Sequence, residues 1–187
     1  MVRTVESAGW LDGARRVPSP NSDSRPTGTE VSLAVVHSIS LPRGQYRQDA
    51  GGSAIERLFT NRLDAVAHAS FADLAGLRVS AHFLIYRDGA LVQFVPLQQR
   101  AWHAGASRWR GRERCNDFSV GIELEGIDDG RFAAAQYESL IALLRKLQAV
   151  LPLREVAAHS DIAPGRKSDP GSRFDWARLL QKLARRA

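Results

Sequence analysis

Short apolar runs that alternate with helical segments constrain the fold of this chain more than any other feature. The β-branched run Val31–Ser38 is typical of a buried strand. Further strands are predicted at His82–Tyr86, Ala90–Val95, Val120–Leu124 and Val156–His159. Asp88-Gly89 between two of these runs indicates a tight hairpin. Strands interleaved with helices predict one α/β domain, with a central mixed sheet flanked by helices.

Helical periodicity is strongest in the second half of the chain. Ala133–Val150 carries apolar residues at three- and four-residue spacing. A final helix is predicted at Asp175–Ala184, with its apolar face made of Trp176, Leu179, Leu180 and Leu183. Shorter helices are predicted at Ala54–Leu63 and Ala69–Ala75, inside the long connection Leu41–Leu77. Long connections in compact domains are often functional, which raises the hypothesis that this one is a movable lid.

The N-terminal part of the chain has a different composition. Arg15–Gly28 is rich in Pro, Ser and Gly, so residues 1–30 are predicted to be an irregular segment packed on a domain that spans 31–187. No apolar stretch approaches the roughly 20 residues that span a bilayer, and the N-terminus lacks the pattern of an export signal. We therefore expect a cytoplasmic protein without a membrane partner. The single cysteine, Cys115, agrees with a reducing compartment.

The chain is basic, with a net charge of +6 and an isoelectric point near 10.2. This charge raises the possibility of nucleic-acid binding, but the basic residues are scattered and no recognition motif accompanies them. Two interpretations stay open: a solvated basic surface, or attraction to a small ligand with several carboxylates. No nucleic-acid partner is expected.

Two of the five histidines directly follow strand-like runs. His37 ends one run and His159 ends another, and binding residues in α/β sheets gather where strands end. Asp169 lies ten residues after His159, and Pro164 and Gly165 allow the intervening loop to turn back. Two histidines and one carboxylate with an open position form a recurrent catalytic zinc site. Many proteins contain this combination by chance, so the pattern alone is not specific.

Amide hydrolysis at such a site also needs a base and a donor for the oxyanion. Glu123 and Glu125 fall on one face of their predicted strand, and either could be the base or a solvent-facing residue. Lys167 could bring an ammonium group to the metal, or be an exposed loop lysine.

Several segments, in order along nearly the whole chain, resemble one family. They are Val35–Pro42, Arg78–His82, Ala101–Gly105, Gly111–Ser119, Gly121–Gly126 and His159–Gly171. Together they resemble the AmpD family, cytosolic zinc-dependent 1,6-anhydro-N-acetylmuramoyl-L-alanine amidases that share the fold of amidase type 2 and of peptidoglycan recognition proteins. The resemblance implies a zinc site in a surface cleft of the 31–187 domain.

The resemblance also implies roles for individual residues. One Zn²⁺ per chain would be held by His37, His159 and Asp169, with Glu123 as the catalytic carboxylate and Lys167 as the oxyanion donor. Substrate contacts are implied at Ser38, Arg78, Trp102, Arg114 and Ala163. Arginine suits this task because its planar fork pairs with carboxylates. Ser38 departs from the family's usual asparagine, which puts the strength of one substrate contact in doubt.

The other histidines and the cysteine are predicted to be structural. We expect His82 to pack within its strand, His103 to form part of the cleft wall, His68 to lie on the surface and Cys115 not to be a nucleophile.

The implied function is hydrolysis of the amide between 1,6-anhydro-N-acetylmuramic acid and L-alanine, during cytosolic recycling of peptidoglycan. As in the family, its loss would affect β-lactamase induction. The expected partner is a small anionic muropeptide, and the expected state is a monomer. A non-catalytic muropeptide sensor is disfavoured because all three ligand positions are filled. A lytic amidase of intact wall would need export or a wall-binding repeat, and a nucleic-acid module is the remotest alternative.

Overall fold

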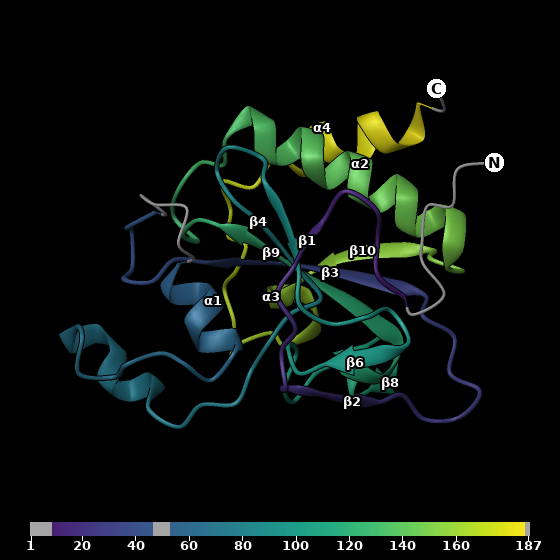
Figure 1. Cartoon of the computed structure of the whole chain (residues 1–187). Coiled ribbons are helices and arrows are strands. Elements are labelled where there is room, and N and C mark those ends of the chain that lie inside the picture. Colours follow the sequence, from purple (N-terminus) through teal and green to yellow (C-terminus); the bar gives the residue numbers. More distant parts are fainter. Residues whose placement is uncertain (1–8, 47–52, 186–187) are drawn as a thin grey trace.

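A six-stranded sheet forms the centre of the computed structural model, which describes residues 9–46 and 53–185 (Figure 1). The strand order is β1-β5-β4-β9-β3-β10. The bounds are β1 Arg15–Arg16, β3 Leu33–Ile39, β4 Phe83–Ile85, β5 Leu91–Gln93, β9 Ser119–Glu125 and β10 Glu155–Ala158. Among the described strand pairs of this sheet, β4–β5 is antiparallel and the others are parallel, so the predicted mixed sheet and its hairpin are confirmed.

The two faces of the sheet are covered differently. Helices α2 (Ala134–Val150) and α4 (Trp176–Ala184) lie together over one face (Figure 1). The other side carries α1 (Ala54–Phe59), the 3₁₀ helix η1 (Ala69–Leu74), the short helix α3 (His159–Ile162) and the small sheets. Those sheets pair β2 (Ser22–Ser24) with β6 (Gln99–Ala101) and β7 (Arg108–Trp109) with β8 (Arg112–Glu113), and the 3₁₀ helix η2 (Cys115–Phe118) follows.

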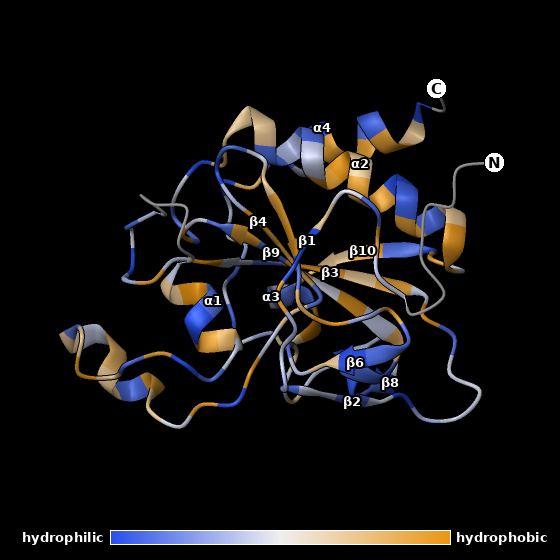
Figure 2. Cartoon of the chain, viewed as in Figure 1, coloured by the Kyte–Doolittle hydropathy of each residue, from blue (hydrophilic) through white to orange (hydrophobic). Residues whose placement is uncertain are grey.

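Alternation along the central strands decides which residues face which layer. In β9, Val120, Ile122 and Leu124 pack in the core beneath α2, so Gly121 and Glu123 point to the opposite face. Figure 2 shows the largely apolar central strands, with the more hydrophilic β6 and β8 grouped on the side away from α2 and α4. The face away from α2 is therefore where polar side chains of β3 and β9 can meet.

The predicted helices and strands are largely confirmed, but the structure also differs from the prediction. The segment expected to be irregular contains β1 and β2, whose partners β5 and β6 are distant in sequence. Helix α1 ends at Phe59 and not at Leu63, because Asn61 adopts a left-handed φ of 58°. His159 begins α3 and does not end β10. Leu180, expected on the packed face of α4, is 53% exposed.

Part of the predicted lid region, 47–52, lies outside the described residues, and the lid hypothesis stays a prediction. In the described ranges, no helix combines the length and apolar character that crossing a bilayer would require.

Candidate metal centre and active site

Parallel pairing of β3 with its two neighbours brings the candidate residues together. His37 lies near the carboxyl end of β3, in register with Glu123 of β9. On the other side of β3, Ala158 ends β10 opposite Val36, so His159 follows beside His37. The loop after α3 then returns, and the backbone N–H of Ser160 donates to the carbonyl of Asp169 at 3.0 Å.

The three predicted ligands converge. One donor atom from each of His37, His159 and Asp169 lies within 4.8 Å of the other two. Asp169 Oδ2 is 3.3 Å from Nδ1 of His37 and 3.0 Å from Nδ1 of His159. Two imidazole nitrogens and one carboxylate oxygen facing one point are suited to a divalent metal such as zinc.

The electrostatics of this group keep His37 neutral and Asp169 ionised. Burial lowers the pKa of His37 to about 4, although its hydrogen bond with Asp169 acts in the opposite direction. Burial acts to raise the pKa of Asp169, but its contacts with His159 and His37 lower it below the usual range. A neutral imidazole and an ionised carboxylate are the forms that bind metals.

Glu123 is the neighbouring carboxylate with an unused oxygen. The residue is 9% exposed, and its Oε2 has no hydrogen-bond partner among the described residues. Burial raises its pKa well above the usual value, the charge of Asp169 acts in the same direction, and Lys167 opposes them. A carboxyl group of this kind is suited to proton transfer.

Glu125, the competing carboxylate, is already used in the fold. One of its oxygens accepts a hydrogen bond from the backbone N–H of Arg87 at 3.2 Å. The strand pleat places both glutamates on one face. They differ because an oxygen of Glu125 accepts a hydrogen bond, whereas Oε2 of Glu123 has no partner among the described residues.

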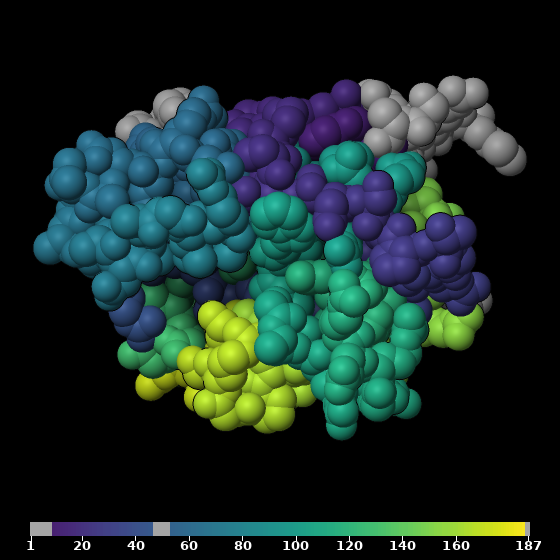
Figure 3. Space-filling view, turned by 90° about the horizontal axis from the view of Figure 1, so that it is seen from below, coloured from purple at the N-terminus to yellow at the C-terminus, as the bar shows by residue number. Residues whose placement is uncertain are grey.

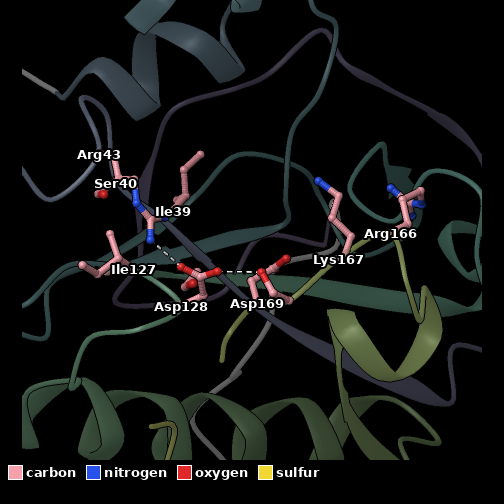
Figure 4. Close-up of a pocket in the computed structure, with 11 residues that line it drawn as sticks. Ile39, Ser40, Arg43, Ile127, Asp128, Arg166, Lys167 and Asp169 are labelled. Carbon is pink, nitrogen blue, oxygen red and sulfur yellow. Dashed lines mark hydrogen bonds and ion pairs between the residues drawn. The ribbon is translucent and has the colours of Figure 1, made fainter. Parts of the chain in front are cut away.

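His37, His159 and Asp169 are called the metal group below. A cavity of about 390 Å³ lies beside this group (Figure 4). Its lining includes Ser38, Asp169 and the exposed Lys167. In Figure 4, Arg43 bonds Asp128 on one side of the cavity, while Lys167 and Arg166 lie on the other. The space-filling view shows this face hollowed between the α1–η1 segment and the loop after α3 (Figure 3).

A second cavity of about 600 Å³ adjoins the first and shares Arg166 with it. Its walls include Ala163 and the basic residues Arg108 and Arg114, with one acidic residue, Glu113. The guanidinium group of Arg114 is 73% exposed. The charged residues of this lining are mainly arginines, which suit a ligand that carries carboxylates.

Two predicted substrate residues are not in the walls of these two cavities. Arg78 lines a smaller cavity with residues of α1 and of the segment after η1. The indole N–H of Trp102 donates to Asp23 Oδ1 at 3.0 Å, which holds the ring against β2. Their substrate contacts stay predictions.

The remaining histidines and the cysteine have structural positions. His82 is buried, and its Nδ1 accepts a hydrogen bond from the N–H of Gly121. His68 is exposed and caps η1. Cys115 is buried in the cluster formed with Leu33 and Phe118. His103 lies closer to the metal group than a cleft-wall position implied, because its Nδ1 is 2.9 Å from Nε2 of His37.

Sequence reasoning missed three residues near the site. Asn116 Oδ1 accepts hydrogen bonds from the backbone N–H groups of His103 and Ala104. Arg166 donates to the carbonyl oxygens of Ala104 and Ala106. Gly121 lies against the ring of His103. All three lie in the segments that carry the family resemblance, but only the tertiary structure shows what they contact.

Comparisons with known proteins agree with this geometry. The family described as N-acetylmuramoyl-L-alanine amidase matches residues 27–172. The chain is 56% identical to the 1,6-anhydro-N-acetylmuramyl-L-alanine amidase AmpD of Escherichia coli K12, over 91% of this chain and 92% of that protein. It is 44% identical to the protein of the same name in Haemophilus influenzae, over 97% of this chain and 98% of that protein.

Solved structures of amidases are also similar to this chain. A crystal structure of a selenomethionine AmpD derivative has a TM-score of 0.90 at 52% identity, over 96% of this chain and 98% of that one. The amidase AmiD from E. coli, in complex with anhydro-N-acetylmuramic acid-L-Ala-D-gamma-Glu-L-Lys, has a TM-score of 0.58 at 32% identity, over 95% of this chain and 65% of that one. The predicted resemblance is confirmed, and the chain belongs to the N-acetylmuramoyl-L-alanine amidase family.

Proposed function

We propose that this chain hydrolyses the amide bond between 1,6-anhydro-N-acetylmuramic acid and L-alanine in muropeptides, using one Zn²⁺. The observation that carries the proposal is the convergence of His37, His159 and Asp169 within 4.8 Å, with Glu123 in register beside His37. The two AmpD relatives carry this activity in their names, and the AmiD complex contains an anhydromuropeptide.

The metal-binding residues would be His37, His159 and Asp169. When bound, zinc would supply Lewis acidity that polarises the scissile carbonyl and makes a water nucleophilic. The chain's part is to hold two imidazoles and one carboxylate with their donor atoms facing a common point.

Glu123 would move the proton. Its Oε2, which has no hydrogen-bond partner in the described part of the chain, would take a proton from the attacking water and pass it to the leaving amine of L-alanine. A raised pKa suits both steps, because the carboxylate is then a strong enough base to accept the proton and hold it until the C–N bond breaks.

Lys167 would stabilise the oxyanion of the tetrahedral intermediate. The chain presents this lysine on the wall of the same cavity as Asp169. Its positive charge lowers the pKa values of both His37 and Glu123. A fixed positive charge at the developing oxyanion lowers the barrier.

The substrate would lie across the two adjoining cavities. We assign Ser38 to the cavity beside the metal group, and Arg114 and Ala163 to the larger basic cavity, which suits the carboxylates of the peptide. Arg78 and Trp102 complete the proposed set, although they lie outside these two cavities. The proposal includes a monomeric, cytoplasmic enzyme of peptidoglycan recycling whose loss affects β-lactamase induction.

The test compares two alanine variants with the unmodified chain. Glu123→Ala should retain zinc and lose most turnover, whereas His159→Ala should lose both. Metal analysis and mass spectrometry of an anhydromuropeptide digest, with and without a chelator, measure the two properties. Full activity in either variant, or activity that survives complete zinc removal, would refute the mechanism.

A further inference from the structure

The loop after β6 contacts the outer nitrogens of both metal-binding histidines. His37 Nε2 is 2.9 Å from Nδ1 of His103, and the two rings are nearly perpendicular at 89°. His159 Nε2 is 3.5 Å from the carbonyl oxygen of the next residue, Ala104. Consecutive residues of one loop therefore face both histidines on the side away from Asp169.

The hydrogen bonds behind His103 fix where its proton lies. The hydroxyl of Ser119 is 2.6 Å from the carbonyl oxygen of Cys115, which can only accept, so Ser119 donates its proton there. Ser119 Oγ is also 3.0 Å from Nε2 of His103 and must accept from it. His103 therefore carries a proton on Nε2.

This proton position determines the state of His37. Neither ring nitrogen of His103 has a carboxylate partner in the described ranges, so the ring is neutral and its Nδ1 is an acceptor. His37 must then donate from Nε2, which leaves the lone pair of its Nδ1 directed toward Asp169 and His159. The chain of bonds runs from the backbone of η2 to the metal group.

The surrounding structure holds His103 in place. Asn116 Oδ1 accepts from the N–H groups of both His103 and Ala104, at 3.1 and 2.8 Å. A methyl group at Gly121 would lie 2.4 Å from Cγ of His103, so glycine is needed for the ring to lie over β9. His103 is thus held from its backbone and from beneath its ring.

We propose that His103 is a positioning residue that holds His37 in the tautomer and orientation that bind the metal. The inference rests on the proposed zinc site and adds a residue to it. His103 is not a ligand in this arrangement, because its two nitrogens face His37 and Ser119. Outer partners of metal-binding histidines raise ligand basicity and restrict the ring, and their loss typically weakens metal binding roughly 10- to 100-fold.

The experiment measures zinc affinity in the full chain by competition with a chromophoric chelator. His103→Leu removes the acceptor and should weaken binding roughly 10- to 100-fold. His103→Asn places an amide oxygen near the position of Nδ1 and should recover most of that loss. His68→Leu, at an exposed histidine, is the matched control and should bind like the unmodified chain.

A second measurement locates the ring proton of His103 directly. Long-range ¹H–¹⁵N spectra of the zinc-loaded chain should show His103 protonated on Nε2 only, and Ser119→Ala should weaken this preference while the protein remains folded. This readout remains if His103→Leu fails to fold. An Nδ1-protonated His103, or equal zinc affinity in His103→Leu and the unmodified chain, would overturn the inference. Failure of the unmodified chain to bind zinc would instead refute the proposed function.

Discussion

Lys167 is the residue whose proposed role depends most on charge alone. It is exposed, lies on the cavity wall, and contributes no donor to the metal group. Lys167→Met should therefore lower kcat roughly 10²- to 10³-fold, the usual loss for one oxyanion donor, while zinc affinity stays unchanged. Lys167→Arg keeps the positive charge and should lose less. Steady-state kinetics on anhydromuropeptide and zinc titration measure both, and a variant in which only KM rises would assign Lys167 to substrate binding.

At the residue scale, the convergence of the metal group could be predicted because the positions of its histidines relative to the strands indicate it. His37 and His159 follow strand-like runs, and adjacent parallel strands bring their carboxyl ends together. The choice between Glu123 and Glu125 needed partners that no local pattern shows. The role of His103 was out of reach for the same reason, because its proton position depends on Ser119 and Cys115 across a turn of η2.

At the element scale, β9 must carry a glycine where the His103 loop crosses it. Gly121→Ala should displace the ring, because the new methyl group would lie 2.4 Å from Cγ. Overpacking of this kind costs about 1–3 kcal/mol. The measurement is urea unfolding of Gly121→Ala in two backgrounds. With His103→Ala the obstructing ring is absent, so the same substitution should cost much less. Equal costs in both backgrounds would show that Gly121 serves the strand itself.

Elements with a strong local period were predicted well, and elements defined by their partners were not. Helix α2 was placed almost to the residue by its apolar spacing. Strands β1 and β2 were missed because two or three residues carry no period, and Ser22 pairs with the distant Ala101. The prediction of the packed face of α4 was partly wrong, since Leu179 is buried while Leu180 faces solvent.

At the scale of the whole molecule, the face that carries the site buries several imidazoles in one layer. The rings of His37 and His82 both lie close to that of His103, with centroids 5.0 and 5.9 Å from it. Each ring must be neutral to be buried at low cost. The same burial that leaves nitrogen lone pairs available for a metal makes the folded state sensitive to acid.

His82 allows this sensitivity to be measured away from the proposed metal ligands. Burial, helped by the charge of Arg25, lowers its pKa to about 3 in the folded protein, against 6.5 ordinarily. Between these two pH values, the imidazole of His82 binds a proton in the unfolded chain but not in the folded chain. Stability is therefore retained above pH 6.5 and lost as pH falls toward 3, by about 1.4 kcal/mol per pH unit.

The slope of unfolding free energy against pH isolates this contribution. His82→Asn keeps an acceptor oxygen near the position of Nδ1 for the N–H of Gly121, but it cannot titrate. Urea unfolding gives the unfolding free energy at each pH between about pH 6 and about pH 4. The slope of this free energy against pH should correspond to about one proton fewer in His82→Asn than in the unmodified chain. The absolute stability of the variant does not matter, because every other group titrates in both proteins. Parallel slopes would mean that His82 is charged in the fold, and the hydrogen bond that its Nδ1 accepts from Gly121 would then have to be absent.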